Sequence, residues 1–433
     1  MEDPARYKTG YRLQSVHSGK IFDDTGWILE PPGEPVPSLV RAVYEEPRLN
    51  IKDDGWGIYR FADWLPVRRI LEGSSAPVTY KSTGLAKETG LKNLFITFSG
   101  YWPEKGGWMR TCSFKETEAY SVCARMDPGH KKVLVVASAG NTARAFARVC
   151  SDNRVPLLLC VPECALDALW FDEPIGECVR LAVTGPGSDY FDAIHLSNLA
   201  ASLEGFVPEG GARNIARRDG MGTTVLSAAT FIGRIPDFYF QAIGSGTGAI
   251  AAWEANLRLI ADGRFGNHKM KLMLSQNIPF HPMYDAWKAG SRDLLPFNDD
   301  EARSKVARIL AQVLSNRRPP YSIPGGVFDA LTDTEGDVFL ATNEEAVRAA
   351  GLFRETEGID IHPAAAVATA SLLHALADKR IPPDSFVMLN ITGGGEERFK
   401  SEKKLYFLEP AVRFGIQPAP EEVKKKLEGL FTC

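Results

Sequence analysis

The sequence lacks several features that would place it in a specialised class of protein. It has no basic excess, since 50 Lys and Arg residues stand against 54 Asp and Glu, for a net charge of −4. This balance argues against nucleic acid or an anionic membrane as a partner. Its longest apolar runs, Val133–Ala139 and Val155–Val161, fall far short of the roughly 20 residues that a membrane-spanning helix needs. We therefore expect no nucleic-acid or membrane partner.

Cysteine is also scarce, and its spacing shows no disulfide framework or metal site. The seven cysteines form no C-x-x-C pair, and Cys160 and Cys164 have no matching second pair. A structural zinc site wants four close ligands, so we expect no metal. The first residues, MEDPARYKTGYR, lack the apolar core of a secretory signal. Together these absences predict a reduced, cytoplasmic protein.

The chain does have the composition of a large globular protein. Its 433 residues are 44% hydrophobic and 24% charged, which suits two large domains and a small appendage. Residues 1–54 are rich in polar and turn residues and are expected to form that appendage, packed on a large domain. From Gly55 onward strand-like and helix-like segments alternate, which predicts an α/β protein with parallel sheets and helices on both faces. The expected strands are Leu94–Thr97, Val133–Ala137, Val155–Val161, Asp237–Ile243, Met270–Leu274 and Phe386–Ile391. The expected helices are 113–125, Thr142–Cys150, Ala249–Ala261, Glu344–Thr356 and Ala364–Leu376.

One candidate for chemistry lies where a helix is expected to begin. Ser113 and Glu116 have the spacing of a capping box, which predicts a helix start there. Lys115 would then lie in the first turn, where the helix dipole disfavours a cation and lowers the pKa of the amine. An amine with a lowered pKa is what a Schiff-base lysine needs. A solvated surface lysine is the alternative interpretation.

Three further segments follow expected strands, the position at which open α/β sheets bind ligands. Ala137–Thr142 consists mostly of small residues, and amides at the following helix start can hold a carboxylate or a phosphate. Gly244–Gly248 has three glycines and two hydroxyls, which is typical of an anion-cradling loop. With Ala249 it also fits the dinucleotide fingerprint, so a nicotinamide-dependent oxidoreductase stays open. Thr392, in the segment Asn390–Gly395, would point into the same crevice.

In combination these segments resemble the threonine synthase branch of the fold type II pyridoxal-phosphate (PLP) enzymes. The pieces that carry the resemblance run from Gly55 onward and are EGSSAPVTYKSTGLAKETGLKNLFI, SFK, SAGNT, PPYSIPGGVFDAL and EGIDIHPAAAVA. SFKETEAYSVCARMD and NITGGGEERF resemble more closely its cysteate synthase subfamily. The resemblance implies a tryptophan synthase β-like fold, with the cofactor between two open parallel-sheet α/β domains. We expect a large PLP-binding domain in residues 55–112 and 228–433 and a smaller, mobile domain in 113–227.

The resemblance also implies a role for each matching residue. Lys115 would form the Schiff base with PLP, Asn141 would bind the ring hydroxyl, and Thr392 would meet the pyridine nitrogen. The cofactor phosphate would be held by the loop of Gly244, Ser245, Gly246, Thr247 and Gly248. The substrate carboxylate would be held by the turn of Ser138, Ala139, Gly140 and Thr142. Apart from the resemblance, Arg110 and Thr111 lie beside the lysine motif and are candidates for a cationic pocket that binds phosphate and sulfite in turn.

That subfamily converts O-phospho-L-serine and sulfite to L-cysteate and phosphate, a β-replacement that serves coenzyme M biosynthesis. The chain departs from threonine synthase where Lys115 is followed by Glu-Thr-Glu, and where His362 stands in place of a glutamate. Three other activities stay open: a threonine synthase acting on O-phosphohomoserine, an O-phosphoserine sulfhydrylase using sulfide, and the nicotinamide-dependent oxidoreductase. For each of the PLP-dependent activities we expect small-molecule substrates and a homo-oligomer.

Overall fold

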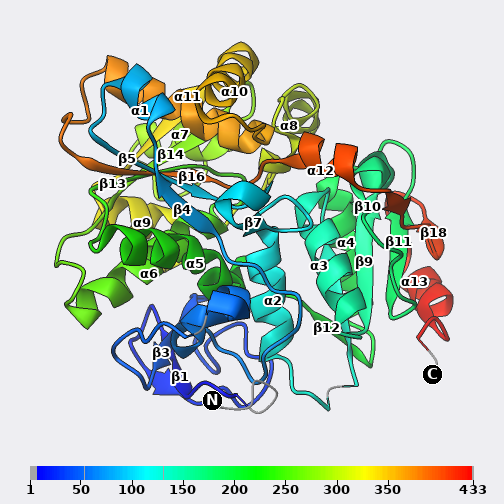
Figure 1. Ribbon diagram of the computed structural model, residues 1–433. Helices are drawn as coiled ribbons and strands as arrows, with labels where there is room; N and C mark the ends of the chain where they lie inside the picture. The colour runs from blue at the N-terminus through cyan, green and yellow to red at the C-terminus, as the bar shows by residue number, and fades with distance from the viewer. Residues whose placement is uncertain (1–6, 53, 130, 432–433) are drawn as a thin grey trace.

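The computed structural model describes residues 7–52, 54–129 and 131–431 and contains two sheets built on parallel strands (Figure 1). The larger sheet has the strand order β15-β14-β13-β16-β5-β4. Its neighbours are parallel except β4, which pairs antiparallel with β5 at one edge. The strands are β4 (Val78–Lys81), β5 (Asn93–Phe98), β13 (Phe238–Ala242), β14 (Lys271–Asn277), β15 (Asp337–Ala341) and β16 (Phe386–Ile391).

The smaller sheet is parallel throughout and has the strand order β12-β8-β9-β11-β18. Its strands are β8 (Val133–Ala137), β9 (Leu157–Pro162), β11 (Val179–Thr184), β12 (Phe206–Pro208) and β18 (Val412–Phe414). The central strands of both sheets are short apolar runs buried on two faces, as parallel sheets between helices require. Every strand expected from the sequence is present, with ends that differ by a few residues.

Helices cover both faces of the larger sheet (Figure 1). On one face α10 (Asn343–Glu357) and α11 (Pro363–Ala377) pack on strand residues such as Ile96 and Leu389. The opposite face is covered by α5 (Ile215–Ile232), α6 (Thr247–Asp262) and α9 (Val327–Asp333). The shorter helices are α1 (Gly84–Thr89), α7 (Pro282–Lys288), α8 (Asp299–Val306) and α12 (Glu396–Glu402). The predicted α/β architecture is therefore confirmed for this sheet.

The smaller sheet is likewise enclosed on both faces. α2 (Lys115–Arg125) and α3 (Asn141–Asp152) share a core with Leu134 and Leu159. α4 (Tyr190–Ala201) and α13 (Pro420–Leu427) share another with Val135 and Cys160 on the other face. The two helices that begin at Lys115 and Asn141 thus lie together on one side of the sheet.

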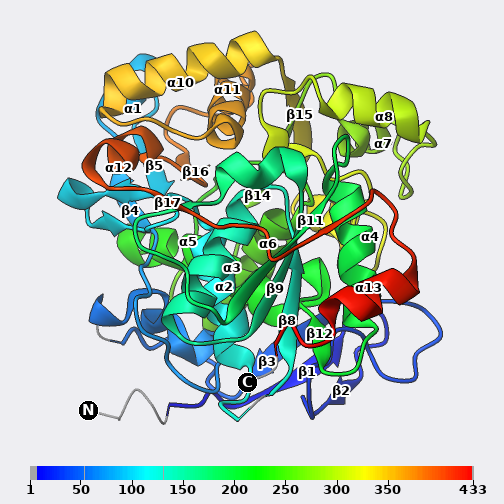
Figure 2. The same ribbon diagram turned by 90° about the vertical axis from the view of Figure 1, so that its right-hand side faces the viewer.

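The structure departs from the expected division in two places. Residues 215–227 were expected in the smaller domain, but they belong to α5, which packs on the larger sheet. The second departure is at the C-terminal end. β17 (Tyr406–Phe407) pairs with β10 (Trp170–Phe171), and β18 pairs with β11. Figure 2 shows this C-terminal segment running across the smaller sheet to α13. Residues 406–427 therefore lie with the smaller sheet, whereas the sequence placed them in the large domain. The physical reason is that β18 covers the free edge of β11. A strand of three residues is too short to be recognised in the sequence.

The N-terminal residues form a small antiparallel sheet, as an appendage to the rest. Its strands are β1 (Tyr11–Ser15), β2 (Ile21–Phe22) and β3 (Val40–Tyr44). Leu13 and Val40 share a core with Ile215 at the start of α5. Buried Arg125 of α2 also pairs with Asp24 at 3.0 Å. The appendage therefore contacts helices next to both sheets, and a short helical segment, η2 (Asp54–Trp64), leads on to β4.

A close helix contact positions α2, the helix that begins at Lys115. A Cβ atom on Gly220 of α5 would lie 2.3 Å from the carbonyl oxygen of Thr117. Only glycine permits this approach of the two backbones. Gly222, two residues on in α5, is different, because a Cβ there would make ordinary contacts at 3.4 Å with Ala251 and Ala255.

We predict that Gly220→Ala destabilises the protein and that Gly222→Ala does not. The first substitution pushes α5 away from α2, an overpacking that costs about 1–3 kcal/mol. The second removes a helix-breaking residue without a clash, which stabilises a helix by up to about 1 kcal/mol. Thermal unfolding followed by circular dichroism measures both. Equal melting temperatures for the two variants would contradict this account of the contact.

Candidate functional site

A pocket lies between the two sheets, at the carboxyl ends of their strands. It is lined by Lys115 at the start of α2, Asn141 at the start of α3, the loop 244–248 between β13 and α6, and Thr392 after β16. The structure thus brings together the four segments that the sequence singled out. Val313, Leu314, Met221 and His362 complete much of the wall.

The loop 244–248 is shaped to hold an anion. Gly246 has φ +77° and caps α6, whose first amides face the pocket from Thr247 on. Ser245 and Thr247 lie side by side, with their hydroxyl oxygens 2.8 Å apart. A Cβ on Gly244 would lie 2.8 Å from the carbonyl oxygen of Val313, and one on Gly248 would lie 2.4 Å from the Gln241 amide. The glycines therefore let the loop pack directly against Val313 and Gln241, so a side chain at either position would displace the loop.

Backbone contacts to the segment after β16 place Lys115. Phe114 N donates to Thr392 O at 2.9 Å, and Gly394 N donates to Cys112 O at 3.1 Å. The predicted capping box of Ser113 and Glu116 is wrong, because α2 begins after Phe114 and has no side-chain cap. The Ser113 hydroxyl accepts from Lys115 N at 3.1 Å, and the Glu116 carboxylate accepts from Thr111 N. Hydrogen bonds within residues 111–116 therefore stabilise the turn, and its backbone contact with Thr392 places Lys115 in the same pocket as Thr392.

Lys115 is an amine with a depressed pKa, as the sequence suggested, but the main cause differs. Its side chain is 18% exposed, and burial lowers the pKa of the amine. The nearby Arg217 guanidinium lowers it further, while Glu118 opposes the shift. Lys115 Nζ lies 3.2 Å from Glu118 Oε2 and 4.8 Å from the centre of the Phe114 ring.

Asn141 is oriented by a buried arginine. Its Oδ1 accepts from Arg144 Nη2 at 3.0 Å, which leaves the amide N–H groups to donate to a ligand. Arg144 also donates to Thr111 O and Ala168 O, and its guanidinium lies 4.0 Å from the centre of the Trp170 ring. The side chain is 2% exposed, so Arg144 acts from behind the pocket wall.

Arg144 is linked to His362 through one carboxylate. Glu396 of α12 lies 3.3 Å from Arg144 Nη2 and 2.9 Å from His362 Nε2. These two neighbours and Lys400 hold the pKa of Glu396 well below its usual range, against the effect of burial. His362 lines the pocket, and its ring lies where a Cβ on Gly393 would be. One carboxylate therefore joins α3 of the smaller part to the start of α11.

The turn expected to hold a substrate carboxylate lies beside Asn141. Ser138, Ala139 and Gly140 connect β8 to α3, Thr142 is the second residue of α3, and the Ser138 hydroxyl accepts from Gly140 N at 3.2 Å. Thr142 is already engaged, because its hydroxyl donates to Glu118 Oε1 at 3.0 Å.

Arg110 and Thr111 do not reach the pocket. Arg110 is held by three carboxylates: Asp172 at 2.8 Å, Glu173 at 2.7 Å and Asp152 at 3.3 Å. Thr111 is 1% exposed, and its backbone is committed to Arg144 and Glu116. The expected cationic pocket is therefore absent at these two residues, because acidic partners distant in the sequence neutralise the arginine.

Sequence reasoning missed a buried charge cluster next to Lys115. Glu118 is fully buried and lies 3.4 Å from Arg217 Nη2. Arg217 in turn makes two hydrogen bonds to Glu209, at 2.8 and 2.7 Å. Glu118 carried a signal, since it stands one helical turn from Lys115 where threonine synthases differ. Arg217 and Glu209 carried none, because only the fold brings them to Lys115.

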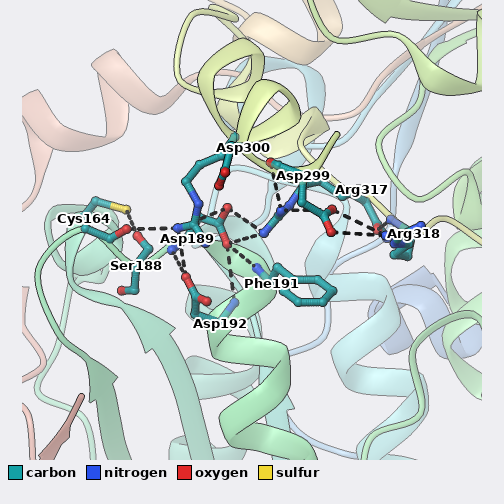
Figure 3. Close-up of polar contacts among 12 residues, drawn as sticks. Cys164, Ser188, Asp189, Phe191, Asp192, Asp299, Asp300, Arg317 and Arg318 are labelled. Carbon is teal, nitrogen blue, oxygen red and sulfur yellow. Dashed lines mark hydrogen bonds and ion pairs between the residues drawn. The ribbon is translucent and has the colours of Figure 1, made fainter. Parts of the chain in front are cut away.

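An ion cluster joins α4 to the segment that follows α7 (Figure 3). Asp189 caps α4 by accepting from Phe191 N, and it also pairs with Arg317 at 3.0 Å. Arg317 reaches Asp299 at 3.4 Å. The segment between Asp299 and Arg318 supplies Val313 and Leu314 to the pocket wall. The cluster therefore fastens this wall to the helix that covers the smaller sheet.

A metal site and a membrane-spanning helix are both absent from the part of the chain that the structure describes. Within residues 7–52, 54–129 and 131–431, no group of His, Cys, Asp and Glu side chains is arranged to hold a metal ion. None of the helices in those ranges is both long and apolar enough to span a membrane.

Comparison with known proteins agrees with this geometry. Residues 81–393 match the family described as pyridoxal-phosphate dependent enzyme. The cysteate synthase of Methanosarcina acetivorans is 49% identical over 389 residues, which is 89% of this chain and 93% of that protein. The cysteate synthase of Methanocella paludicola is 50% identical over 394 residues, 90% of this chain and 92% of that protein. That of Methanoculleus marisnigri is 48% identical over 404 residues, 93% of each chain.

Solved structures show the same fold at low sequence identity. Maize serine racemase superposes with a TM-score of 0.55 at 16% identity, over 75% of this chain and 91% of that one. A fungal L-serine ammonia-lyase from Rhizomucor miehei gives a TM-score of 0.55 at 14% identity, over 76% and 100%. These neighbours confirm the expected fold type II architecture. With its cofactor pyridoxal phosphate, the chain belongs to the pyridoxal-phosphate dependent enzymes and, within them, to the family of the cysteate synthases.

Proposed function

We propose that this chain converts O-phospho-L-serine and sulfite to L-cysteate and phosphate. The observation that carries the chemistry is the meeting of Lys115, Asn141, the loop 244–248 and Thr392 in one pocket. The choice of substrates is supported by relatives at 46–50% identity over most of the chain, all of which are cysteate synthases.

The residues present fit pyridoxal phosphate. Lys115 would carry it as a Schiff base, and the amides and hydroxyls of the loop 244–248 would hold its phosphate. Asn141 would donate to the ring hydroxyl through the amide N–H groups that Arg144 leaves free. Thr392 would meet the pyridine nitrogen as a neutral partner, which favours elimination and replacement over transamination. The bound cofactor supplies an electron sink for chemistry at the α-carbon.

The chain's own groups would then move one proton and bind two oxyanions in turn. The released Lys115 amine removes the proton from the substrate's α-carbon as a general base. Phosphate leaves the β-carbon, the sulfur of sulfite bonds to the same carbon, and Lys115 returns the proton to the α-carbon. The turn 138–142 would hold the substrate carboxylate throughout. Closure of the pocket walls would keep water from the reacting carbon.

We also propose a homo-oligomer located in the cytoplasm. Trp108 and Phe231 are each 56% exposed and line one cleft with Trp56 and Ile51. Exposed aromatic groups of this kind mark contact surfaces. A cytoplasmic location is supported by the six described cysteines, which are all free thiols. Sedimentation velocity of the purified protein tests the first proposal.

We predict that the purified protein with pyridoxal phosphate shows sustained release of phosphate from O-phosphoserine, beyond one equivalent per site, only when sulfite is present, and that cysteate accumulates. Lys115→Ala should lower this rate by at least about 10²–10⁴-fold, because the general base is lost. The visible absorption of the Schiff base should disappear with it. Product analysis with O-phosphohomoserine and with sulfide runs in parallel. Threonine formation, or a preference for sulfide, would replace the proposed reaction by one of the alternatives.

A second prediction concerns the arginine behind Asn141. Arg144→Met removes the hydrogen bond that orients the Asn141 amide. Hydrogen bonds to charged groups contribute roughly 1.5–3 kcal/mol. The affinity of the protein for pyridoxal phosphate should therefore fall about tenfold. The matched control is Arg148→Met, one turn along α3. Arg148 is also buried, but it bonds to Asp152 and Ser151 and not to Asn141.

Fluorescence titration of the cofactor-free variants with pyridoxal phosphate measures this difference. Circular dichroism melting curves show whether both variants fold equally well. If Arg148→Met weakened cofactor binding as much as Arg144→Met, the effect would come from general loss of packing in α3.

A further inference from the structure

The contact of Lys115 with Glu118 has no place in the reaction as derived so far. Glu118 is fully buried, yet it contacts Lys115, which lines a pocket that would bind a carboxylate, a phosphate and sulfite. Its Oε2 lies 3.2 Å from Lys115 Nζ, and its Oε1 accepts from the Thr142 hydroxyl at 3.0 Å. A buried anion beside an anion-binding site is costly unless it has a specific cation to match.

The charges around Glu118 identify that cation. Arg217 lies 3.4 Å from Glu118, but two hydrogen bonds commit its guanidinium to Glu209. Tyr190 also faces the cluster from α4, and burial raises its pKa so that it stays a neutral phenol. Two carboxylates and one arginine leave one negative charge over. That charge is matched when Lys115 carries a proton and unmatched when its amine is neutral.

We propose that Glu118 is a positioning residue that holds the released Lys115 as an ammonium ion, so that Nζ stores the α-carbon proton until sulfite has replaced phosphate. This inference rests on the proposed function. It explains why a glutamate stands at position 118, one helical turn from the base and on the same side of α2.

Each atom and electron pair has a destination in this sequence of steps. The Cα–H bond breaks, and the proton goes to the lone pair of Lys115 Nζ. Phosphate leaves with the electron pair of the Cβ–O bond while the α and β carbons become doubly bonded. The sulfur lone pair of sulfite then forms the Cβ–S bond, and the α-carbon takes the proton back from Nζ. No oxidant or reductant is needed.

Storage matters because phosphate must leave and sulfite must arrive between the two proton transfers. During that interval the pocket exchanges ligands with solvent, and a weakly held proton would be lost to water. An ammonium fixed by a buried carboxylate also keeps the Nζ–H near the α-carbon. Thr142 lies on the other oxygen of Glu118, so the same carboxylate ties the base to the turn proposed to hold the substrate carboxylate.

The first test uses the protein without cofactor, so it does not depend on activity. The Lys115 amine is labelled by reductive methylation with formaldehyde and cyanoborohydride, and the peptide is quantified by mass spectrometry. Glu118→Gln removes the negative neighbour, so more of the amine is neutral and labelling at neutral pH should rise several-fold. Glu116→Gln is the matched control, because Glu116 lies in the same turn but bonds to Thr111 N. Equal labelling of wild type and Glu118→Gln would overturn the pairing.

The second test follows the stored proton. O-phosphoserine deuterated at the α-carbon reacts with sulfite in ordinary water, and the deuterium remaining in cysteate is measured by mass spectrometry. We expect measurable retention in the wild type, a several-fold loss of retention in Glu118→Gln, and restored retention in Glu118→Asp. Glu116→Gln should retain deuterium as the wild type does. A merely structural Glu118 would change the rate of the variant but leave its retention unchanged, which would overturn the proposal.

The two tests separate failure of this inference from failure of the proposed function. If the wild type makes no cysteate, the reaction assignment fails, while the labelling experiment still decides whether Glu118 holds Lys115. If cysteate forms but the wild type retains no deuterium, the reaction stands and storage of the proton on Lys115 is wrong.

Discussion

The site depends on a short backbone contact between residues 112–114 and 392–394. Phe114 N donates to Thr392 O, and Gly394 N donates to Cys112 O. This contact sets the start of α2 against the end of β16, so Lys115 and Thr392 line the same pocket. The glycines make it possible: a Cβ on Gly393 would lie 2.2 Å from His362 Nδ1, and one on Gly394 would lie 2.5 Å from the Asp360 carbonyl oxygen. A larger residue at either place would separate the base from the cofactor site.

Charge is arranged in the same way on two sides of the pocket. On one side Glu396 lies between His362 and the buried Arg144; on the other Glu118 lies between Lys115 and the buried Arg217. In each case a carboxylate touches a pocket side chain, and an arginine behind it offsets part of its charge. Because both arginines are buried, their hydrogen bonds are directional and hold the pocket groups in one geometry. The first pair orients Asn141 through Arg144, and the second contacts Lys115, the proposed general base.

Features that depend on neighbouring residues could be predicted from the sequence. The apolar runs predicted the strands, and the glycines of the loop 244–248 indicated an anion cradle. The predictions that failed depend on contacts between residues distant in the sequence. Arg110 was a candidate phosphate ligand, but the fold places Asp152, Asp172 and Glu173 next to it. The capping box at Ser113 failed because backbone contacts to residue 392 replaced it.

The neutralised arginines imply how this protein binds oxyanions. Arg110, Arg144 and Arg217 each have carboxylate partners, and the whole chain carries a net charge of −4. Attraction by a positive field therefore contributes little. The donors of the proposed cofactor site are neutral: the amides at the start of α6, the hydroxyls of Ser245 and Thr247, and the Asn141 amide. The site would therefore hold the cofactor phosphate by the direction and number of its hydrogen bonds and not by ion pairs.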